Sequence, residues 1–109
     1  MKAFAGLAAD PSTAEGAEAA FILIQDAYDR ADYDKVENLV YDFSQKGVSQ
    51  SYWLSRAYLV LGDSFAARGN KAQAKATYES IRDGYVPAGP DDDVQDNVKL
   101  RLERLESAN

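Results

Sequence analysis

Two amphipathic segments joined by a very short turn, within residues 51–81, constrain the fold of this chain more than any other feature. Apolar residues recur every three to four positions before the turn, and the same spacing returns after it. The turn is Arg68-Gly69-Asn70, in which glycine tolerates the left-handed backbone that ends a helix and asparagine caps the next one. The segment therefore predicts two antiparallel helices that bury their apolar faces on each other. The expected buried positions are Leu54, Ala57, Tyr58, Leu61 and Phe65, then Ala74, Tyr78, Ile81 and Tyr85.

The same helical period predicts further helices on both sides of this pair. One begins with a capping box, Ser12 with Glu15 three positions later, and runs to about Arg30. Asp32 caps the next helix, and Gly47 lies just past its end. No segment alternates with a period of two, so the chain is expected to be all-α.

The C-terminal part is predicted to form a stiff connection followed by a last helix at about residues 92–106. Pro87 and Pro90 break the helical pattern before it. The acidic run at residues 91–93 lacks the alternating spacing and closing glutamate of a calcium loop, so it is interpreted as a helix start. The inner side is expected to carry Val94, Val98, Leu102 and Leu105, and the outer side Asp96, Lys99, Arg101, Glu103 and Arg104.

Seven positions around the central turn resemble the pattern of the tetratricopeptide repeat (TPR) family. They are Tyr58, Leu61, Gly62, Phe65, Gly69, Ala74 and Tyr78. The resemblance implies an α-α superhelix, a TPR-like solenoid of two antiparallel helix pairs plus a C-terminal capping helix, similar to bacterial repeat proteins. With 109 residues, one domain is expected. Its parts would be an N-terminal tail or helix stump at 1–11, repeats at 12–47 and 50–86, and the capping helix at 91–107.

The first helix pair aligns on the second when Ala31 is placed on Gly69. This offset is longer than the usual repeat of the family, and we assign the difference to the segment at 47–50. The presence of Gly62 inside a predicted helix also needs an explanation, because glycine in a helix interior costs about 1 kcal/mol relative to alanine. Close approach of Ala74 or Tyr78 from the partner helix is the expected reason.

Composition narrows the functional classes. A net charge of −6 and a pI near 4.5 argue against nucleic acid as a ligand. The chain has no cysteine and no histidine, so no nucleophile–base pair and no transition-metal site is expected. We therefore expect no enzyme and no cofactor. The apolar run at the N-terminus is too short for a signal peptide, and no window reaches the length of a membrane span, so a soluble chain is expected, in a compartment left open.

The resemblance implies a concave groove lined by the first helix of each repeat. By position, the groove residues would be Glu18, Phe21, Gln25, Tyr28, Asp29, Arg56, Leu59, Asp63 and Ala66. The family's Lys/Asn/Arg set that clamps a terminal carboxylate is missing. The expected function is a protein–protein interaction or scaffold module that binds an extended peptide or a partner helix. Phe21 and Leu59 are either groove or core residues.

Two alternatives remain open. The chain is either a structural C-terminal cap of a longer repeat protein or a homodimerisation module, because only Phe4 and Leu7 are available to cover its N-terminal side. The other alternative is a small-ligand or glycan binder that uses Trp53 and the neighbouring tyrosines.

Overall fold

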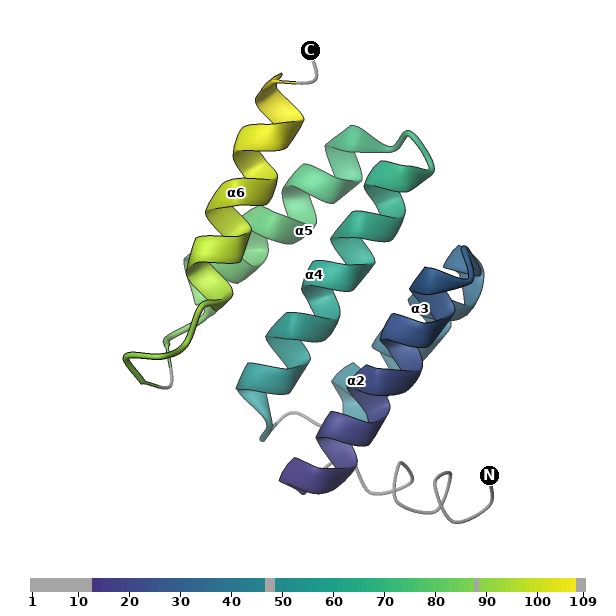
Figure 1. The fold of residues 1–109 in the computed structure, drawn as a ribbon, viewed down its shortest axis with the longest axis vertical. Helices are drawn as coiled ribbons and strands as arrows, with labels where there is room; N and C mark the ends of the chain where they lie inside the picture. Colours follow the sequence, from purple (N-terminus) through teal and green to yellow (C-terminus); the bar gives the residue numbers. More distant parts are fainter. Residues whose placement is uncertain (1–12, 47–48, 88, 108–109) are drawn as a thin grey trace.

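The computed structural model describes residues 13–46, 49–87 and 89–107, and across these ranges all regular structure is helical (Figure 1). The all-α prediction is confirmed for this part of the chain. The N-terminal segment at 1–11, Ser12 and Gly47 lie outside the described residues. The helices are α2 (Ala14–Asp29), α3 (Tyr33–Lys46), α4 (Ser51–Ala67), α5 (Lys71–Gly84) and α6 (Val94–Ser107).

The helices form two layers around α4. In Figure 1, α2, α4 and α6 lie in front, while α3 and α5 lie behind them. α4 contacts all four other helices. α6 packs mainly on α5 and touches α4 much less.

The core is continuous through both layers, and α4 contributes most to it. Its buried surface is wider than the sequence predicts: Leu59 and Val60 are buried as well, whereas Leu54 and Tyr58 are only half-buried. The reason is that α4 is covered from several sides, so a single apolar stripe does not describe it. Leu59, 5% exposed, is therefore a core residue. The predicted repeat positions Leu61, Gly62, Phe65, Ala74 and Tyr78 are all buried.

Gly62 permits a close contact between α4 and the Tyr78 ring of α5. A Cβ atom placed on Gly62 would lie 2.4 Å from Cε1 of Tyr78 and 2.9 Å from its Cδ1. Real Cβ atoms essentially never come this close to a ring, so any side chain here would displace Tyr78. The expected approach of Tyr78 is confirmed.

The turns after α2 and α4 have the same structure. Ala31 (φ 58°) and Gly69 (φ 82°) both adopt the left-handed conformation. In each turn, the amide of the following residue donates to a carbonyl five positions earlier, at 2.9 Å in the first turn and 2.8 Å in the second. This is the Schellman arrangement, which satisfies carbonyls that the helix end leaves free.

Two details at helix ends differ from the sequence predictions. The N-cap of α2 is Thr13, whose Oγ1 accepts a 3.0 Å hydrogen bond from the Gly16 amide, so the predicted cap at Ser12 was one position early. α5 ends at Gly84, which places Tyr85 just beyond the helix rather than on its stripe. Tyr85 is still buried, and its hydroxyl donates to Asp92.

The acidic run before α6 serves the helix start. Oδ1 of Asp92 accepts a 3.0 Å hydrogen bond from the amide of Val94, where α6 begins. Within the described ranges, no group of three or more acidic, histidine or cysteine side chains could hold a metal ion.

Candidate interaction furrow

Side chains of α2, α4 and α6 surround two adjoining hollows on the front face, which we together call the furrow. The hollows measure about 80 and 360 Å³ and share Arg101. Of the predicted groove residues, those that line the furrow are Phe21, Gln25, Tyr28, Arg56, Leu59, Asp63 and Ala66. Glu18 and Asp29 are exposed and do not line it; Asp29 instead accepts a 3.0 Å hydrogen bond from Gln25 on its own helix.

An ion pair joins α4 to α6 across the furrow. Nε and Nη2 of Arg101 lie 2.8 and 3.1 Å from the two carboxylate oxygens of Asp63. Nη1 of Arg101 donates to Oδ1 of Asn97 at 3.0 Å, and the Tyr78 hydroxyl donates to Asp63. The bidentate geometry fixes the orientation of both side chains.

The position of Arg101 corrects the sequence interpretation, which placed it on the outer side of the last helix. Its side chain is only 23% exposed. Arg101 lies three positions after the buried Val98, and residues at that spacing share a helix face. The interpretation rested on charge alone, whereas the carboxylate that makes this inward position favourable, Asp63, lies far earlier in the chain on α4.

Two members of this cluster, Tyr78 and Arg101, keep their protons at neutral pH. Burial raises the pKa of Tyr78, and the hydrogen bond to Asp63 raises it further. Burial acts to lower the pKa of the Arg101 guanidinium, but the hydrogen bond and charge of Asp63 outweigh it, so that pKa is raised. Tyr78 therefore stays a neutral donor and Arg101 stays a cation, as a structural link between helices requires.

Arg56 lies in an aromatic cluster at the other end of the furrow. Its guanidinium carbon is 4.7 Å from the ring centre of Phe21, 5.4 Å from that of Trp53 and 5.6 Å from that of Tyr52. Phe21 and Trp53 also contact each other across α2 and α4, with centroids 5.8 Å apart. Stacking holds the planar cation in place. Among the described residues, no carboxylate pairs with Arg56.

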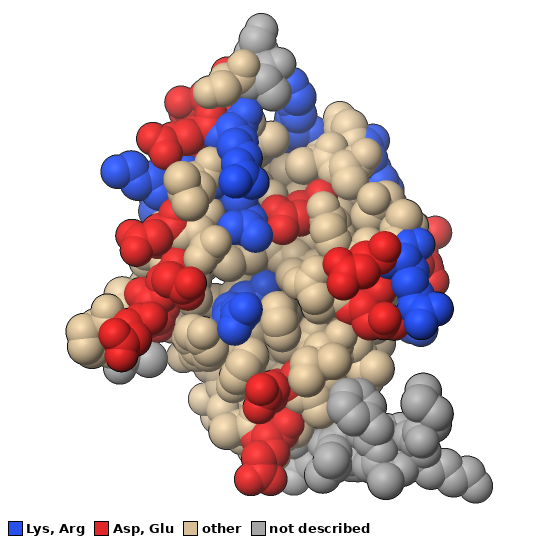
Figure 2. Space-filling view, in the orientation of Figure 1, with Lys and Arg blue, Asp and Glu red and all other residues tan. Residues whose placement is uncertain are grey.

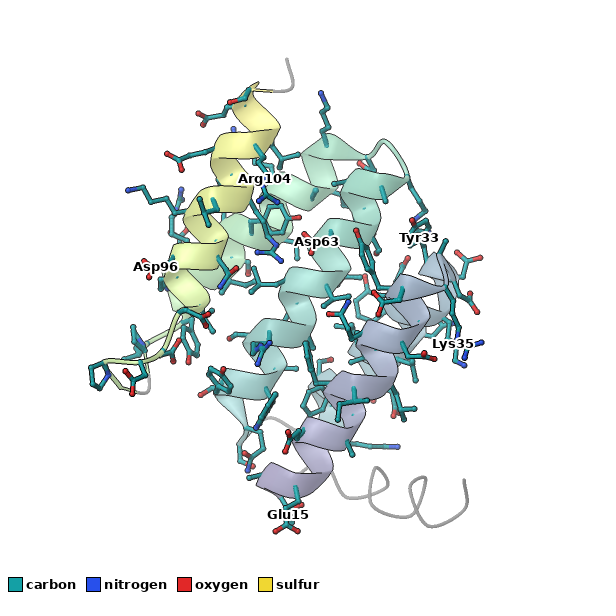
Figure 3. The ribbon with its side chains drawn as sticks, viewed as in Figure 1. Glu15, Tyr33, Lys35, Asp63, Asp96 and Arg104 are labelled. Atoms are coloured by element: carbon teal, nitrogen blue, oxygen red, sulfur yellow. The ribbon has the colours of Figure 1, made fainter. Side chains whose placement is uncertain are left out.

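The furrow has a cationic lining on an acidic protein. Arg56, Arg101 and Arg104 line it, against the carboxylates of Asp63 and Asp93. Figure 2 shows blue atoms gathered near the middle of this face, while red atoms lie mostly towards its edges. Figure 3 shows Arg104 on α6 and Asp63 on α4 at the same part of the furrow. Of these three arginines, only Arg101 has a carboxylate partner within the ranges described. Nη1 of Arg56 donates a 3.3 Å hydrogen bond to the Tyr52 hydroxyl instead.

Comparison of the chain with protein-family models, curated proteins and solved structures found no match. The resemblance to the tetratricopeptide repeat family therefore stays a prediction. Within the part of the chain that the structure describes, no helix is both long enough and apolar enough to cross a bilayer.

Proposed function

We propose that this chain is a non-enzymatic interaction module that holds a segment of a partner protein in the furrow. The observation that carries the proposal is the furrow itself, two adjoining hollows that side chains of α2, α4 and α6 line. Surfaces of this kind accept an extended peptide or the apolar side of a helix.

Two features support a TPR-like superhelix as the underlying architecture. The helices alternate between the layers, with α2, α4 and α6 in front and α3 and α5 behind. The turns after α2 and α4 repeat the same hydrogen bonds at Ala31 and Gly69, the two positions that the alignment of the helix pairs matches. Both features are those of stacked helix pairs, in which α6 acts as the capping helix.

The side chains of the furrow suggest the chemistry of the partner. Phe21 and Tyr28 offer half-buried aromatic surface, and Arg56 and Arg104 offer guanidinium groups without carboxylate partners among the described residues. A guanidinium group binds a carboxylate through paired, charge-assisted hydrogen bonds. We therefore expect a partner segment that carries both apolar and acidic side chains.

Site-specific photo-crosslinking tests this proposal. A benzophenone amino acid at Ala66, in the furrow, should capture a partner protein from extracts of the cells that produce the chain. The matched control is the same amino acid at Asn38, an exposed position on α3. The Arg56→Gln/Arg104→Gln double variant should reduce the Ala66 product.

Two crosslinking outcomes would contradict the furrow as the binding surface, and a third would contradict only the acidic partner. Identical products at Ala66 and Asn38, or no product at Ala66 with the folded protein, would remove the furrow as the binding surface. A product at Ala66 that the double variant leaves unchanged would keep the furrow and remove the acidic partner.

A further inference from the structure

A second hollow lies between α3 and α5, with α4 as its floor, and we call it the cleft. Its volume is about 640 Å³. Leu54, Tyr58 and Phe65 of α4 form the floor, Tyr41 stands on the α3 side and Ile81 on the α5 side. The residues that line it include no Asp, Glu, Lys or Arg, although these make up 28% of the chain.

The cleft and the furrow lie on opposite sides of α4. The residues of α4 that line the cleft include Leu54, Tyr58, Leu61 and Phe65, and those that line the furrow include Arg56, Leu59, Asp63 and Ala66. Each set repeats every three or four positions, and the two sets are one to two positions apart. At about 100° per residue, that offset turns the two stripes away from each other.

The shape of the cleft favours a single extended chain as its occupant. The lining follows α4 from Ser51 to Phe65, a length of about 21 Å at about 1.5 Å per residue. A helix of this length, about 10–12 Å across with its side chains, fills roughly 1,600–2,400 Å³, so the cleft does not enclose one. The volume lies within the range of small-molecule sites, about 300–1,000 Å³.

The lining also defines the polarity of the occupant. A charged group placed against a lining without counter-charges would lose its hydration without compensation, so the part of the ligand inside the cleft must be neutral. The floor is apolar and aromatic, which suits a hydrocarbon chain. Ser51 and Ser55 supply hydroxyl groups at the end of the cleft where α4 begins.

We propose that the cleft binds a neutral, single-chain lipid, whose acyl chain lies along α4 and whose uncharged polar head meets Ser51 and Ser55. The proposal is independent of the furrow and of the partner protein that the furrow would hold.

Titration calorimetry with monolaurin, below the concentration at which it aggregates, tests the proposal. Wild-type protein should bind it saturably, and dodecyltrimethylammonium, with a chain of the same length and a cationic head, at least about fivefold more weakly. Ala76→Trp, an exposed α5 position that lines the cleft, should weaken monolaurin binding at least about tenfold. Ala72→Trp, one turn earlier and outside the cleft, is the matched control and should bind like wild type.

Three results would overturn the proposal. They are the absence of saturable monolaurin binding, equal binding by Ala76→Trp and wild type, and tighter binding of an uncharged extended peptide than of monolaurin. The last result would assign the cleft to a peptide. Ser80→Trp is a second filling variant in case Ala76→Trp does not fold, because Ser80 is also exposed and lines the cleft. Arg56→Gln, in the furrow, should leave monolaurin binding unchanged.

Discussion

The furrow and the cleft lie on two sides of α4 and differ in how the flanking helices are held over it. In each case two flanking helices leave a hollow above α4. Across the furrow, Arg101 and Asp63 form a bidentate ion pair that ties α6 to α4. Across the cleft, no Cα atom of α3 lies within 8 Å of a Cα atom of α5 in the described ranges, and no charged residue lines the space. The comparison teaches that a buried ion pair spans the furrow, whereas the floor of the cleft consists of core residues such as Leu61 and Phe65, and only its exposed edge, such as Tyr41, is expected to contribute little to stability.

Asp63→Ala should produce the largest effect and test the stabilising role of the furrow. It leaves the Arg101 guanidinium and the Tyr78 hydroxyl without their shared acceptor. Because the ion pair is about four-fifths buried, we expect a loss of about 3 kcal/mol in the free energy of unfolding, measured by urea denaturation. Asp96→Ala, at an exposed site on α6, is the control and should stay within about 0.5 kcal/mol. A loss below about 1 kcal/mol in Asp63→Ala would contradict the role of the pair.

Gly62→Leu should produce the next largest loss of stability, because it disturbs the contact between Gly62 of α4 and Tyr78 of α5. A side chain at Gly62 collides with the Tyr78 ring, which is only 1% exposed. Overpacking should cost about 2 kcal/mol, measured as a lower midpoint of thermal unfolding. Gly84→Leu, where nothing lies near the added atoms, is the control for the propensity change. Equal stabilities of the two variants would show that Tyr78 does not depend on Gly62.

Alkaline pH should destabilise the protein through the Tyr78 hydroxyl at the furrow. The pKa of Tyr78 is raised in the folded protein, so the unfolded chain, with a tyrosine pKa of about 10, releases this proton more readily. The stabilisation is complete below about pH 10 and decreases above it. Between about pH 10 and 11, wild type should lose about 1 kcal/mol more than Tyr78→Phe. Parallel pH profiles of the two proteins in chemical denaturation would contradict the assignment.

Tyr41→Ser should produce the smallest effect and tests whether the exposed edge of the cleft is dispensable for folding. Tyr41 is 43% exposed at the edge of the cleft. Its removal should change the free energy of unfolding by about 0.5 kcal/mol or less, measured by urea denaturation. A loss of unfolding free energy as large as that of Asp63→Ala would show that the edge of the cleft also stabilises the fold. The contrast with the furrow would then be wrong.

Local patterns were enough to predict the helices and the contact at Gly62. A glycine inside an amphipathic helix has a local cost, and that cost points to a close neighbour. The turn at Gly69 followed from its residue types. The matching turn at Ala31 did not, because alanine rarely adopts a positive φ; only the offset between the helix pairs indicated it.

Features that depend on distances between helices could not be predicted from the sequence. The inward position of Arg101 requires Asp63 on another helix, and charge alone had suggested a solvent-exposed side chain. The cleft exists because α3 and α5 stay apart over α4, a spacing that no local pattern encodes. Leu59 could be assigned to the core only when the helices covering α4 were known.

Alanine-methyl NMR of the carbon-13-labelled protein tests the separation of the two surfaces most directly. Ala66 reports on the furrow and Ala76 on the cleft. The two ligands are a short peptide of repeated Leu-Glu-Ala and monolaurin, added singly and together. The account predicts that the peptide shifts the Ala66 signal, that monolaurin shifts the Ala76 signal, and that both ligands bind at once. Shifts of both signals by one ligand, or displacement of one ligand by the other, would contradict it.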